Sequence, residues 1–354
     1  MSDSRRANVI GLGLIGGSIA LALRAQGWVV SGDDTDETTA KEALTRDVVD
    51  ELGLDPDAEI TFVATPVMAS ADAVERALGA TSGVVTDVGS VKAPIVAAAS
   101  DQRFIGGHPM AGSEVDGLDG AVAELFSGAV WVITPDDATS DDTIATASAV
   151  IRSLGAEVVG LAPEAHDRLV AVVSHVPHLT AASLMGVATH RAEEHPALLR
   201  LAAGGFRDMT RVASGPPDIW LDICAQNSDA IVAALSELID RLSALRTVVE
   251  TDDREALEQR LRDARQARAN LPARVLHPEE LAEVRIPIPD RAGAAAEVFT
   301  LAAELEVNIA SFEVVHEAER NLGVAVVLVD QSASERFRGG LLARGFRPAV
   351  HPLS

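Results

Sequence analysis

The string Gly11-Leu12-Gly13-Leu14-Ile15-Gly16 constrains the fold more than any other feature of this chain. It follows an apolar, strand-like run that ends at Val9–Gly11, and it opens a segment with helical periodicity, Leu14 to Gln26. In such a strand–turn–helix unit the first glycine permits the tight turn, the second lets the backbone approach a pyrophosphate, and the third allows close helix–strand packing. The helix N-terminus then faces the phosphates with its N–H groups. We therefore predict a dinucleotide site whose loop residues are Gly11, Gly13, Leu14, Ile15 and Gly16.

An acidic residue at the end of the second predicted strand indicates which dinucleotide is bound. Asp33 ends the strand-like run Trp28–Asp33, 22 residues after Gly11. Its carboxylate suits the ribose hydroxyls and repels a 2′-phosphate. No arginine lies between positions 25 and 45 to bind such a phosphate, so the sequence favours NAD over NADP. The adjacent Asp34 is the alternative ribose ligand.

Strand-like runs continue to alternate with helical stretches up to residue 162. The further runs are 60–64, 84–87, 104–106, 130–134 and 157–160. Such alternation predicts a parallel sheet with right-handed crossovers. We therefore expect an α/β Rossmann-type dinucleotide-binding domain over residues 1–162.

The pattern changes at Pro163, since almost no strand signal occurs from there to about Asn270. We expect an all-α helical domain over residues 163–272, in which Pro177 kinks the helix that begins at Pro163. Apolar residues then recur at alternating spacings of four and three: Ile231, Leu235, Leu238, Leu242, Leu245 and Val249. This seam is typical of helix–helix packing, either within the chain or between subunits.

A third pattern follows a predicted linker at 271–280, where Leu271-Pro272 and His277-Pro278 interrupt the chain. The remaining segments have the order β-α-β-β-α-β, beginning with Val284, Ile286 and Ile288 in alternation with polar residues or proline. This order predicts a small α+β domain over residues 280–354.

Composition narrows the classes of partner. The chain has 29 basic and 53 acidic residues, a net charge of −24, which disfavours binding to nucleic acid or anionic membranes. This acidity fits genomic base composition and solubility, or adaptation to high salt. No uninterrupted apolar run reaches the roughly 18–20 residues of a membrane span, and no secretory signal is visible. The single cysteine, Cys224, excludes a disulfide framework and fits a cytoplasmic protein.

Two polar segments follow strands at the sheet edge where doubly wound folds bind ligands, residues 87–92 and 106–114. We expect His108, flanked by Gly-Gly and Pro, to be held on a tight loop. A histidine there suits general acid–base chemistry, the alternative being a surface or core histidine. The helical domain adds residues 174–178 and 204–211.

Within this second set, Arg207 and Arg211 suit a carboxylate clamp, or alternatively surface ion pairs. The histidines of the helical part do not predict a metal site, because no carboxylate lies at ligand spacing with them and Pro177 disturbs their orientation.

These segments, in chain order across residues 8–245, resemble the prephenate dehydrogenases of tyrosine biosynthesis, a family that includes arogenate dehydrogenases. The resemblance is carried by Gly11–Ser18, Asp87–Lys92, Gly107–Glu114, Ser174–His178, Gly204–Asp208, Thr210-Arg211 and Trp220. The C-terminal residues resemble an ACT domain, an amino-acid-binding regulatory module, through the loop Pro289–Gly293.

The resemblance implies a reaction in which NAD takes a hydride from C4 of prephenate and CO2 is lost, giving 4-hydroxyphenylpyruvate. By position it implies that His108 takes the proton of the C4 hydroxyl and that Ser90, also near the cofactor, orients that hydroxyl. The implied substrate site comprises Arg211 as carboxylate clamp, His178 on the side chain, Glu114 as a gate, Ser113 and Trp220. Thr65 and Pro66 are implied to line the nicotinamide.

The same resemblance implies a homodimer formed through the helical domain. It also implies an aromatic amino-acid effector at the ACT-like domain, for which a dimerising appendage is the alternative.

Three other functions stay open at this point. An arogenate dehydrogenase would share fold and site. A β-hydroxyacid dehydrogenase would need a catalytic lysine in the helical part, yet the two lysines are Lys41 and Lys92. A non-catalytic NAD or amino-acid sensor would bind nucleotide without turnover.

Overall fold

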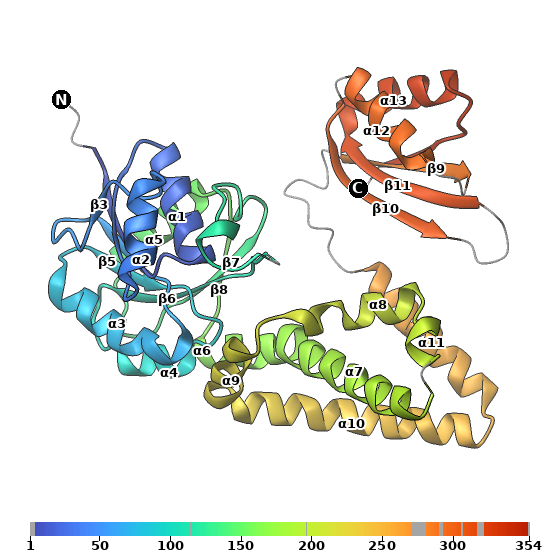
Figure 1. The fold of residues 1–354 in the computed structure, drawn as a ribbon, viewed down its shortest axis with the longest axis horizontal. Helices are drawn as coiled ribbons and strands as arrows, with labels where there is room; N and C mark the ends of the chain where they lie inside the picture. Colours follow the sequence, from blue (N-terminus) through green and yellow to red (C-terminus); the bar gives the residue numbers. More distant parts are fainter. Residues whose placement is uncertain are drawn as a thin grey trace. The chain divides into compact units, whose positions relative to one another are not determined.

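The computed structural model describes residues 4–113, 115–195, 197–270, 281–289, 293–305, 307–316 and 322–352. The chain divides into two compact units, residues 1–263 and 264–354 (Figure 1). Glu114, the predicted linker at 271–280 and positions 290–292 of the predicted effector loop lie outside the described residues.

The first unit contains an eight-stranded sheet with the order β3-β2-β1-β4-β5-β6-β7-β8. Its strands are β1 (Arg6–Ile10), β2 (Val29–Asp33), β3 (Glu51–Leu52), β4 (Ile60–Val63), β5 (Val84–Asp87), β6 (Phe104–Pro109), β7 (Val130–Thr134) and β8 (Glu157–Gly160). All neighbouring pairs are parallel except β6 and β7, which are antiparallel with Gly106 opposite Thr134. The Rossmann-type sheet is thus confirmed, and the expectation that it is parallel throughout is wrong at this one pair.

Helices cover both faces of the sheet. Apolar side chains of α1 (Leu14–Ala25), α2 (Glu37–Thr45) and α5 (Asp141–Ser153) share one core with the inner strands. The opposite face is covered by α3 (Val67–Ala80) and α4 (Ala93–Ala98). This second core also takes in Ile223 and Ile231 of the helical domain, so the two parts of the first unit pack as one body.

His108 lies in a strand, and its expected position on a tight loop is wrong. It belongs to β6, where it is paired opposite Val132 of β7. Gly106 and Gly107 are needed in this strand because an added Cβ would lie 2.3 Å from Thr134 Oγ1 or 2.6 Å from the Asp87 carbonyl oxygen, respectively. The two glycines therefore allow close strand packing rather than a turn, and they hold His108 on a regular element.

The helical domain begins with α6 (Pro163–Val170), a π-helical turn (Ala171–His175) and α7 (Val176–Glu194). Pro177 has no N–H to bond the carbonyl of Val173, and the chain meets this loss with the wider π turn just before it. The later helices are α8 (Gly204–Thr210), α9 (Pro217–Gln226), α10 (Ser228–Glu250) and α11 (Arg254–Ala269). Short 3₁₀ turns cover Leu198–Leu201 and Arg211–Ser214 in this domain, and another covers Leu118–Gly120 between β6 and β7 of the sheet domain.

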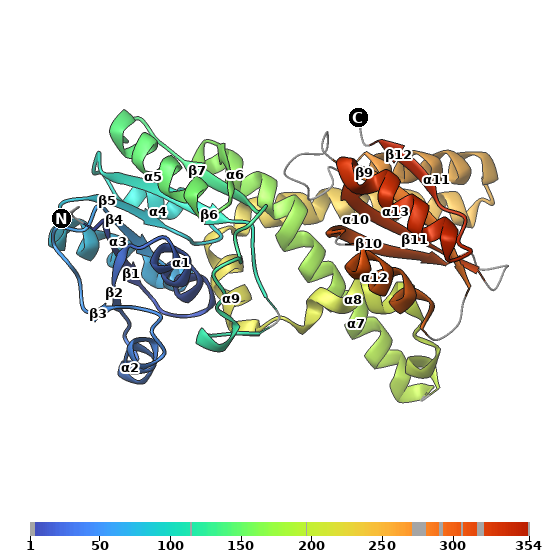
Figure 2. The same cartoon turned by 90° about the horizontal axis from the view of Figure 1, so that it is seen from above.

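Helices α7 and α10 start close together beside the sheet domain and then splay apart (Figure 2). Between them lies an apolar groove of about 420 Å³, lined among others by Val176, Leu184 and Leu238. The predicted apolar seam on α10 is buried near the start of the helix and exposed farther along it. Ile231 is buried within the chain, whereas Leu242 and Val249 are exposed. The first part of the seam therefore packs inside the subunit, and the rest is left uncovered within the described chain.

The second unit is a four-stranded antiparallel sheet with the order β10-β11-β9-β12. Its elements are β9 (Leu281–Pro289), α12 (Ala294–Glu304), β10 (Ile309–His316), β11 (Leu322–Asp330), α13 (Gln331–Ala343) and β12 (Ala349–Pro352). Val284, Ile286 and Ile288 are buried against the two helices, and Arg285 and Pro287 are exposed, as their alternation predicts. Pro287 is tolerated because β12 pairs only with residues 282–285, so β9 is an edge strand where this proline lies.

Candidate active site

The glycine loop has the shape that a dinucleotide pyrophosphate requires. Gly11 has φ +89°, and an added Cβ there would lie 2.4 Å from the Ala64 carbonyl oxygen. A Cβ at Gly16 would lie 1.8 Å from the carbonyl oxygen of Gly11, so the helix packs against the turn itself. Around Gly13, by contrast, an added Cβ would meet no described residue within 4 Å apart from its chain neighbours, and no described side chain caps the N-terminus of α1. This loop fits a bound pyrophosphate.

The two adjacent aspartates that follow β2 have different surroundings. The Asp34 carboxylate accepts hydrogen bonds from the backbone N–H groups of Leu12, at 2.7 Å, and Asp36, at 2.9 Å, so it stabilises the loop. The Asp33 carboxylate lies 3.1 Å from Nη2 of Arg76, which comes from α3. The sequence prediction considered arginines near β2 and missed Arg76, which only the fold brings here.

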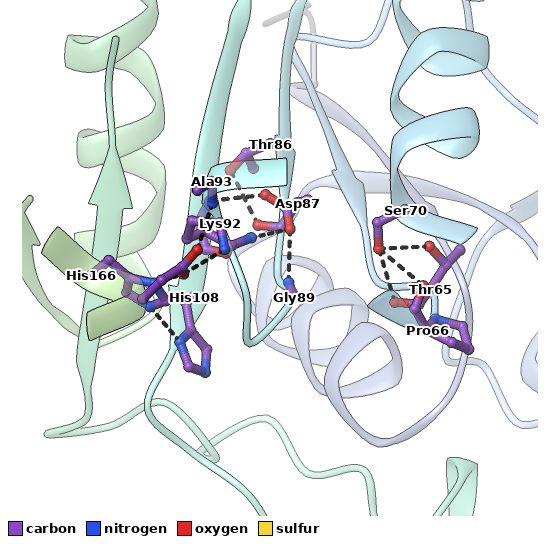
Figure 3. A network of polar contacts seen from close by, with 12 residues as sticks. Thr65, Pro66, Ser70, Thr86, Asp87, Gly89, Lys92, Ala93, His108 and His166 are labelled. Atoms are coloured by element: carbon purple, nitrogen blue, oxygen red, sulfur yellow. Dashed lines mark hydrogen bonds and ion pairs between the residues drawn. The ribbon is translucent and has the colours of Figure 1, made fainter. Parts of the chain in front are cut away.

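Thr65 and Pro66 lie between β4 and α3, at the same edge of the sheet as the glycine loop. Ser70 in the first turn of α3 donates to the backbone oxygen of Pro66 at 3.1 Å, and its Oγ lies 3.3 Å from Thr65 Oγ1 (Figure 3). These bonds hold the turn in place beside the predicted cofactor loop.

A chain of three side chains stands at the end of β6. His108 Nδ1 lies 2.8 Å from His166 Nε2 (Figure 3). His166 Nδ1 in turn lies 2.8 Å from Asp167 Oδ1. Asp167 also accepts the backbone N–H groups of Lys92 and Ala93, each at 2.8 Å. Three donors, two at the start of α4 and one from α6, therefore meet around one carboxylate. The ring of His108 is oriented by this carboxylate through His166.

Hydrogen-bond capacity assigns the protons in this chain. The Asp167 carboxylate can only accept, so His166 carries its proton on Nδ1 and its Nε2 is an acceptor. His108 must then donate from Nδ1 to that nitrogen, which leaves His108 Nε2 without a proton. The arrangement presents an unprotonated ring nitrogen for accepting a proton.

The environment keeps His108 neutral. Desolvation, followed by the positive potential of His166, Lys92 and His175, lowers the pKa of His108 well below 6.5. A neutral imidazole is the form that a proton acceptor needs.

A buried ion pair supports the same strand end. Lys92 is fully buried, and its ammonium pairs with the Asp87 carboxylate and donates to the carbonyl oxygen of Gly107 at 2.8 Å. Asp87 in turn accepts the N–H groups of Gly89, at 2.9 Å, and Gly107, at 3.1 Å. Burial lowers the pKa of Lys92, while the Asp87 charge opposes that shift. The predicted residue Ser90 lies in the loop that this pair fixes.

A second group of predicted residues gathers in the helical domain. The rings of His178 and Trp220 stack, with centroids 3.6 Å apart and an angle of 14° between their planes. Burial lowers the pKa of His178, and a hydrogen bond to the backbone of Val212 opposes the shift. Arg211, the residue before Val212, is exposed at the start of the 3₁₀ turn. Ser113 is exposed in the segment that follows β6, where its Oγ accepts the N–H of Val115 at 3.1 Å.

Asn227 and His175 connect this group to the His108 chain. Asn227 Nδ2 donates to the backbone oxygen of Asp167 at 2.9 Å and lies 3.3 Å from His175 Nδ1. The ring of His175 meets that of Trp220 edge to face, with centroids 6.0 Å apart. Burial lowers the pKa of His175 to about 4, and its Nε2 has no hydrogen-bond partner among the described residues.

The sequence prediction missed His166, Asp167 and Asn227. His166 and Asp167 sit in the first two turns of a helix, in a segment that reads as an ordinary amphipathic surface. A usable signal is that two polar residues fall on the buried face of α6, where apolar residues belong.

Comparison with known proteins agrees with this geometry. Residues 19–160 match the family model for the nucleotide-binding domain of prephenate dehydrogenase, and residues 162–263 match that for its dimerization domain. Prephenate dehydrogenase of Bacillus subtilis (strain 168) is 34% identical over 332 residues, which cover 89% of each chain.

Two solved structures share the fold. Prephenate dehydrogenase from A. aeolicus, in complex with hydroxyphenyl propionate and NAD+, has a TM-score of 0.71 and 27% identity, covering 77% of this chain and 100% of its own. Synechocystis arogenate dehydrogenase has a TM-score of 0.66 and 34% identity, covering 75% and 99%. The predicted family resemblance is thereby confirmed: the chain belongs to the prephenate dehydrogenase family.

Proposed function

We propose that this chain is an NAD-dependent prephenate dehydrogenase that converts prephenate to 4-hydroxyphenylpyruvate and CO2 in the cytoplasm. The observation that carries the proposal is the His108–His166–Asp167 chain at the carboxyl end of β6. It stands at the sheet edge that also holds the glycine loop and Thr65, because β6 runs parallel to β5. A proton acceptor and a dinucleotide site at one edge are what oxidation of an alcohol requires.

The glycine loop, Thr65 and Pro66 would hold NAD, with Asp33 on the ribose. When bound, NAD supplies the acceptor for the hydride that leaves C4 of the substrate. Gly13 gives the pyrophosphate room, and the uncapped N-terminus of α1 offers it backbone donors.

His108 acts as the general base in this proposal. Its Nε2 takes the proton of the C4 hydroxyl, and the resulting imidazolium is stabilised through Nδ1–H by His166 and, behind it, by the Asp167 carboxylate. The C1–carboxylate bond breaks, and its electron pair enters the ring to complete aromatisation. The proton on Nε2 then returns to the developing phenolate oxygen, so His108 ends the cycle neutral. Ser90, fixed by the loop at Asp87, orients the hydroxyl.

Substrate binding is assigned to the helical domain. Arg211 clamps a substrate carboxylate, since a planar guanidinium binds carboxylates in two-point fashion and a dianion needs a cation in a protein of net charge −24. His178 binds the pyruvyl side chain, with Trp220 stacked behind its ring. Ser113 and Glu114 complete the site.

The experiment that tests the proposal measures NADH formation at 340 nm with prephenate and arogenate, each with NAD and NADP. We expect turnover of prephenate with NAD. The substitution His108→Asn should lower kcat by about 10²–10⁴-fold, the range of a general base, with little change in NAD binding. His190→Asn is the matched control, because His190 is an exposed histidine of α7. Equal rates for His108→Asn and the wild type would overturn the assignment of the base.

Arogenate dehydrogenase is the second candidate, favoured by the structural similarity to the Synechocystis enzyme of that name. The two substrates differ only in the side chain, where an amine replaces a ketone. Preference for arogenate in the same assay would keep the site and change the substrate.

We propose that the protein is a homodimer formed through the helical domain. The helical stretch from Pro163 to Glu194 is long and apolar enough to cross a membrane. Only 28% of its most apolar 18 residues are buried within the chain, so most of this apolar stretch is available for contact with a partner. Its polar residues His166, Asp167 and His175 belong to the site described above. A second copy that covers the α7–α10 groove accounts for the exposed apolar residues, and the matched dimerization-domain model supports it.

The second unit is proposed to be an ACT-like domain that binds an aromatic amino acid. Its βαββαβ order and the loop at 289–293 support this role. Titration calorimetry with tyrosine, phenylalanine and tryptophan tests it, and absence of heat with all three would favour a structural appendage.

A further inference from the structure

The cofactor edge of the site contains an ion pair that the sequence did not predict. Arg76 Nη2 lies 3.1 Å from Asp33 Oδ2, and both side chains are partly exposed, at 51% and 30%. Arg76 is 43 residues farther along the chain than Asp33 and reaches it from α3. The Arg76 guanidinium therefore lies beside the Asp33 carboxylate, the group that binds the adenosine ribose in the proposed function.

The neighbouring acid does not compete for this arginine. Both oxygens of Asp34 accept backbone N–H groups, from Leu12 and Asp36. The backbone of Asp33 is also fixed, because its carbonyl oxygen accepts the N–H of Gly11 at 2.8 Å. The ion pair thus joins α3 to a strand end that the glycine loop already holds in position.

We propose that Asp33 and Arg76 together determine the nucleotide specificity of this enzyme. In the native chain, Asp33 neutralises Arg76 and turns a carboxylate toward the ribose hydroxyls, which selects NAD. Without the negative charge of Asp33, Arg76 becomes a binding group for a ribose 2′-phosphate, since arginine recognises phosphate through charge-assisted hydrogen bonds. Arg76 is then a specificity-determining residue in its own right, and repulsion by Asp33 is one of two contributions to the discrimination.

This inference rests on the proposed NAD site, and its test separates the two by using adenosine nucleotides that carry no nicotinamide. Binding of 5′-AMP and of adenosine 2′,5′-bisphosphate is measured by titration calorimetry on the full chain. The variants are Asp33→Asn, Arg76→Gln and the double substitution. Arg152→Gln, which removes one exposed arginine at the end of α5, is the matched control for charge.

We expect the wild type to prefer 5′-AMP. The quantity compared is the ratio of the affinity for adenosine 2′,5′-bisphosphate to the affinity for 5′-AMP. Asp33→Asn should raise this ratio by about tenfold or more, and adding Arg76→Gln should remove most of that gain. Arg152→Gln should leave the ratio unchanged. The NADP-to-NAD ratio of kcat/KM should follow the same order.

Two results would overturn the inference. If the double substitution binds the bisphosphate as well as Asp33→Asn does, loss of repulsion explains the whole effect and Arg76 has no role. If Arg152→Gln lowers the ratio as much as Arg76→Gln, the effect is general electrostatics. Failure of the wild type to bind 5′-AMP would overturn the cofactor site itself, and this inference with it. Thermal unfolding of each variant checks that these exposed substitutions leave the fold intact.

Discussion

At the scale of single residues, Asp167 organises the site. One carboxylate receives the N–H groups of Lys92 and Ala93 and the ring proton of His166. It therefore fixes both the start of α4 and the tautomer of two histidines. Because His108 receives its orientation and its proton arrangement through His166, Asp167 acts in the proposed mechanism as a positioning residue for the base.

The substitution Asp167→Asn should separate these roles. An amide can donate as well as accept, so the tautomer of His166 is no longer fixed and His108 loses its defined proton arrangement. We expect kcat for prephenate to fall by about 10²-fold with KM nearly unchanged. Asp119→Asn, which alters an exposed carboxylate, should behave as wild type. A rise in KM at constant kcat would contradict a positioning role.

The lowered pKa of His108 predicts the pH dependence of the reaction. Only the neutral ring accepts a proton, and desolvation favours the neutral form, so the acid limb of the pH profile should lie below pH 6.5. Activity should stay high from pH 8 down to about pH 6.5 and decline at lower pH. The measurement is kcat/KM against pH for the free enzyme. An acid limb centred above pH 6.5 would contradict the assigned environment.

At the scale of elements, the Lys92–Asp87 pair joins three segments. Lys92 stands at the start of α4, Asp87 ends β5, and the backbone of Gly107 belongs to β6, next to His108. A buried ion pair is costly to desolvate, so its value lies in holding these segments in one arrangement.

Breaking this pair should destabilise the fold. Lys92→Met leaves the Asp87 carboxylate buried without its cation, which costs about 3–5 kcal/mol. We expect the free energy of unfolding, measured with urea, to fall by that amount. The combined substitution with Asp87→Asn should recover part of the loss, since no charge is then left unpaired. A change below about 1 kcal/mol for Lys92→Met would show that the pair is not essential to the fold.

Much of the element pattern was predictable because its causes are local. The glycine spacing, the strand–helix alternation and the alternation of Val284, Ile286 and Ile288 act within a few residues of the chain. The position of His108 in a strand was not predictable from local sequence. Strand β6 is extended through His108 by antiparallel pairing with β7, which lies farther along the chain than the residues that suggested a loop. His166, Asp167 and Arg76 reach the site through helix packing, which leaves no local signature.

At the scale of the whole molecule, helices α7 and α10 of the first unit leave apolar side chains exposed to solvent within the described chain. The groove of about 420 Å³ between them has Leu184 and Leu238 in its lining, and an exposed apolar surface of this kind is typical of an interaction site. Its apolar lining contrasts with the net charge of −24, which keeps other copies apart unless contact area compensates for repulsion.

A charged residue in the groove should break the dimer. We expect the wild type to have twice the subunit mass of 36.9 kDa in light scattering, and Leu184→Asp to have the single-subunit mass at the same concentration. Leu52→Asp, on the exposed edge strand β3, is the matched control and should remain dimeric. A monomeric wild type would contradict the proposed assembly, and so would a dimeric Leu184→Asp variant.

The stacking of His178 on Trp220 gives the protein an intrinsic optical reporter. The chain has no tyrosine and three tryptophans, so the indole emission carries no contribution from tyrosine. Trp28 and Trp131 are buried in the nucleotide-binding part, whereas Trp220 stands in the helical domain with its ring face on a histidine. Any ligand that moves or protonates His178 therefore changes the emission of one identifiable residue. If the proposed substrate site is correct, its occupancy becomes readable without label or turnover.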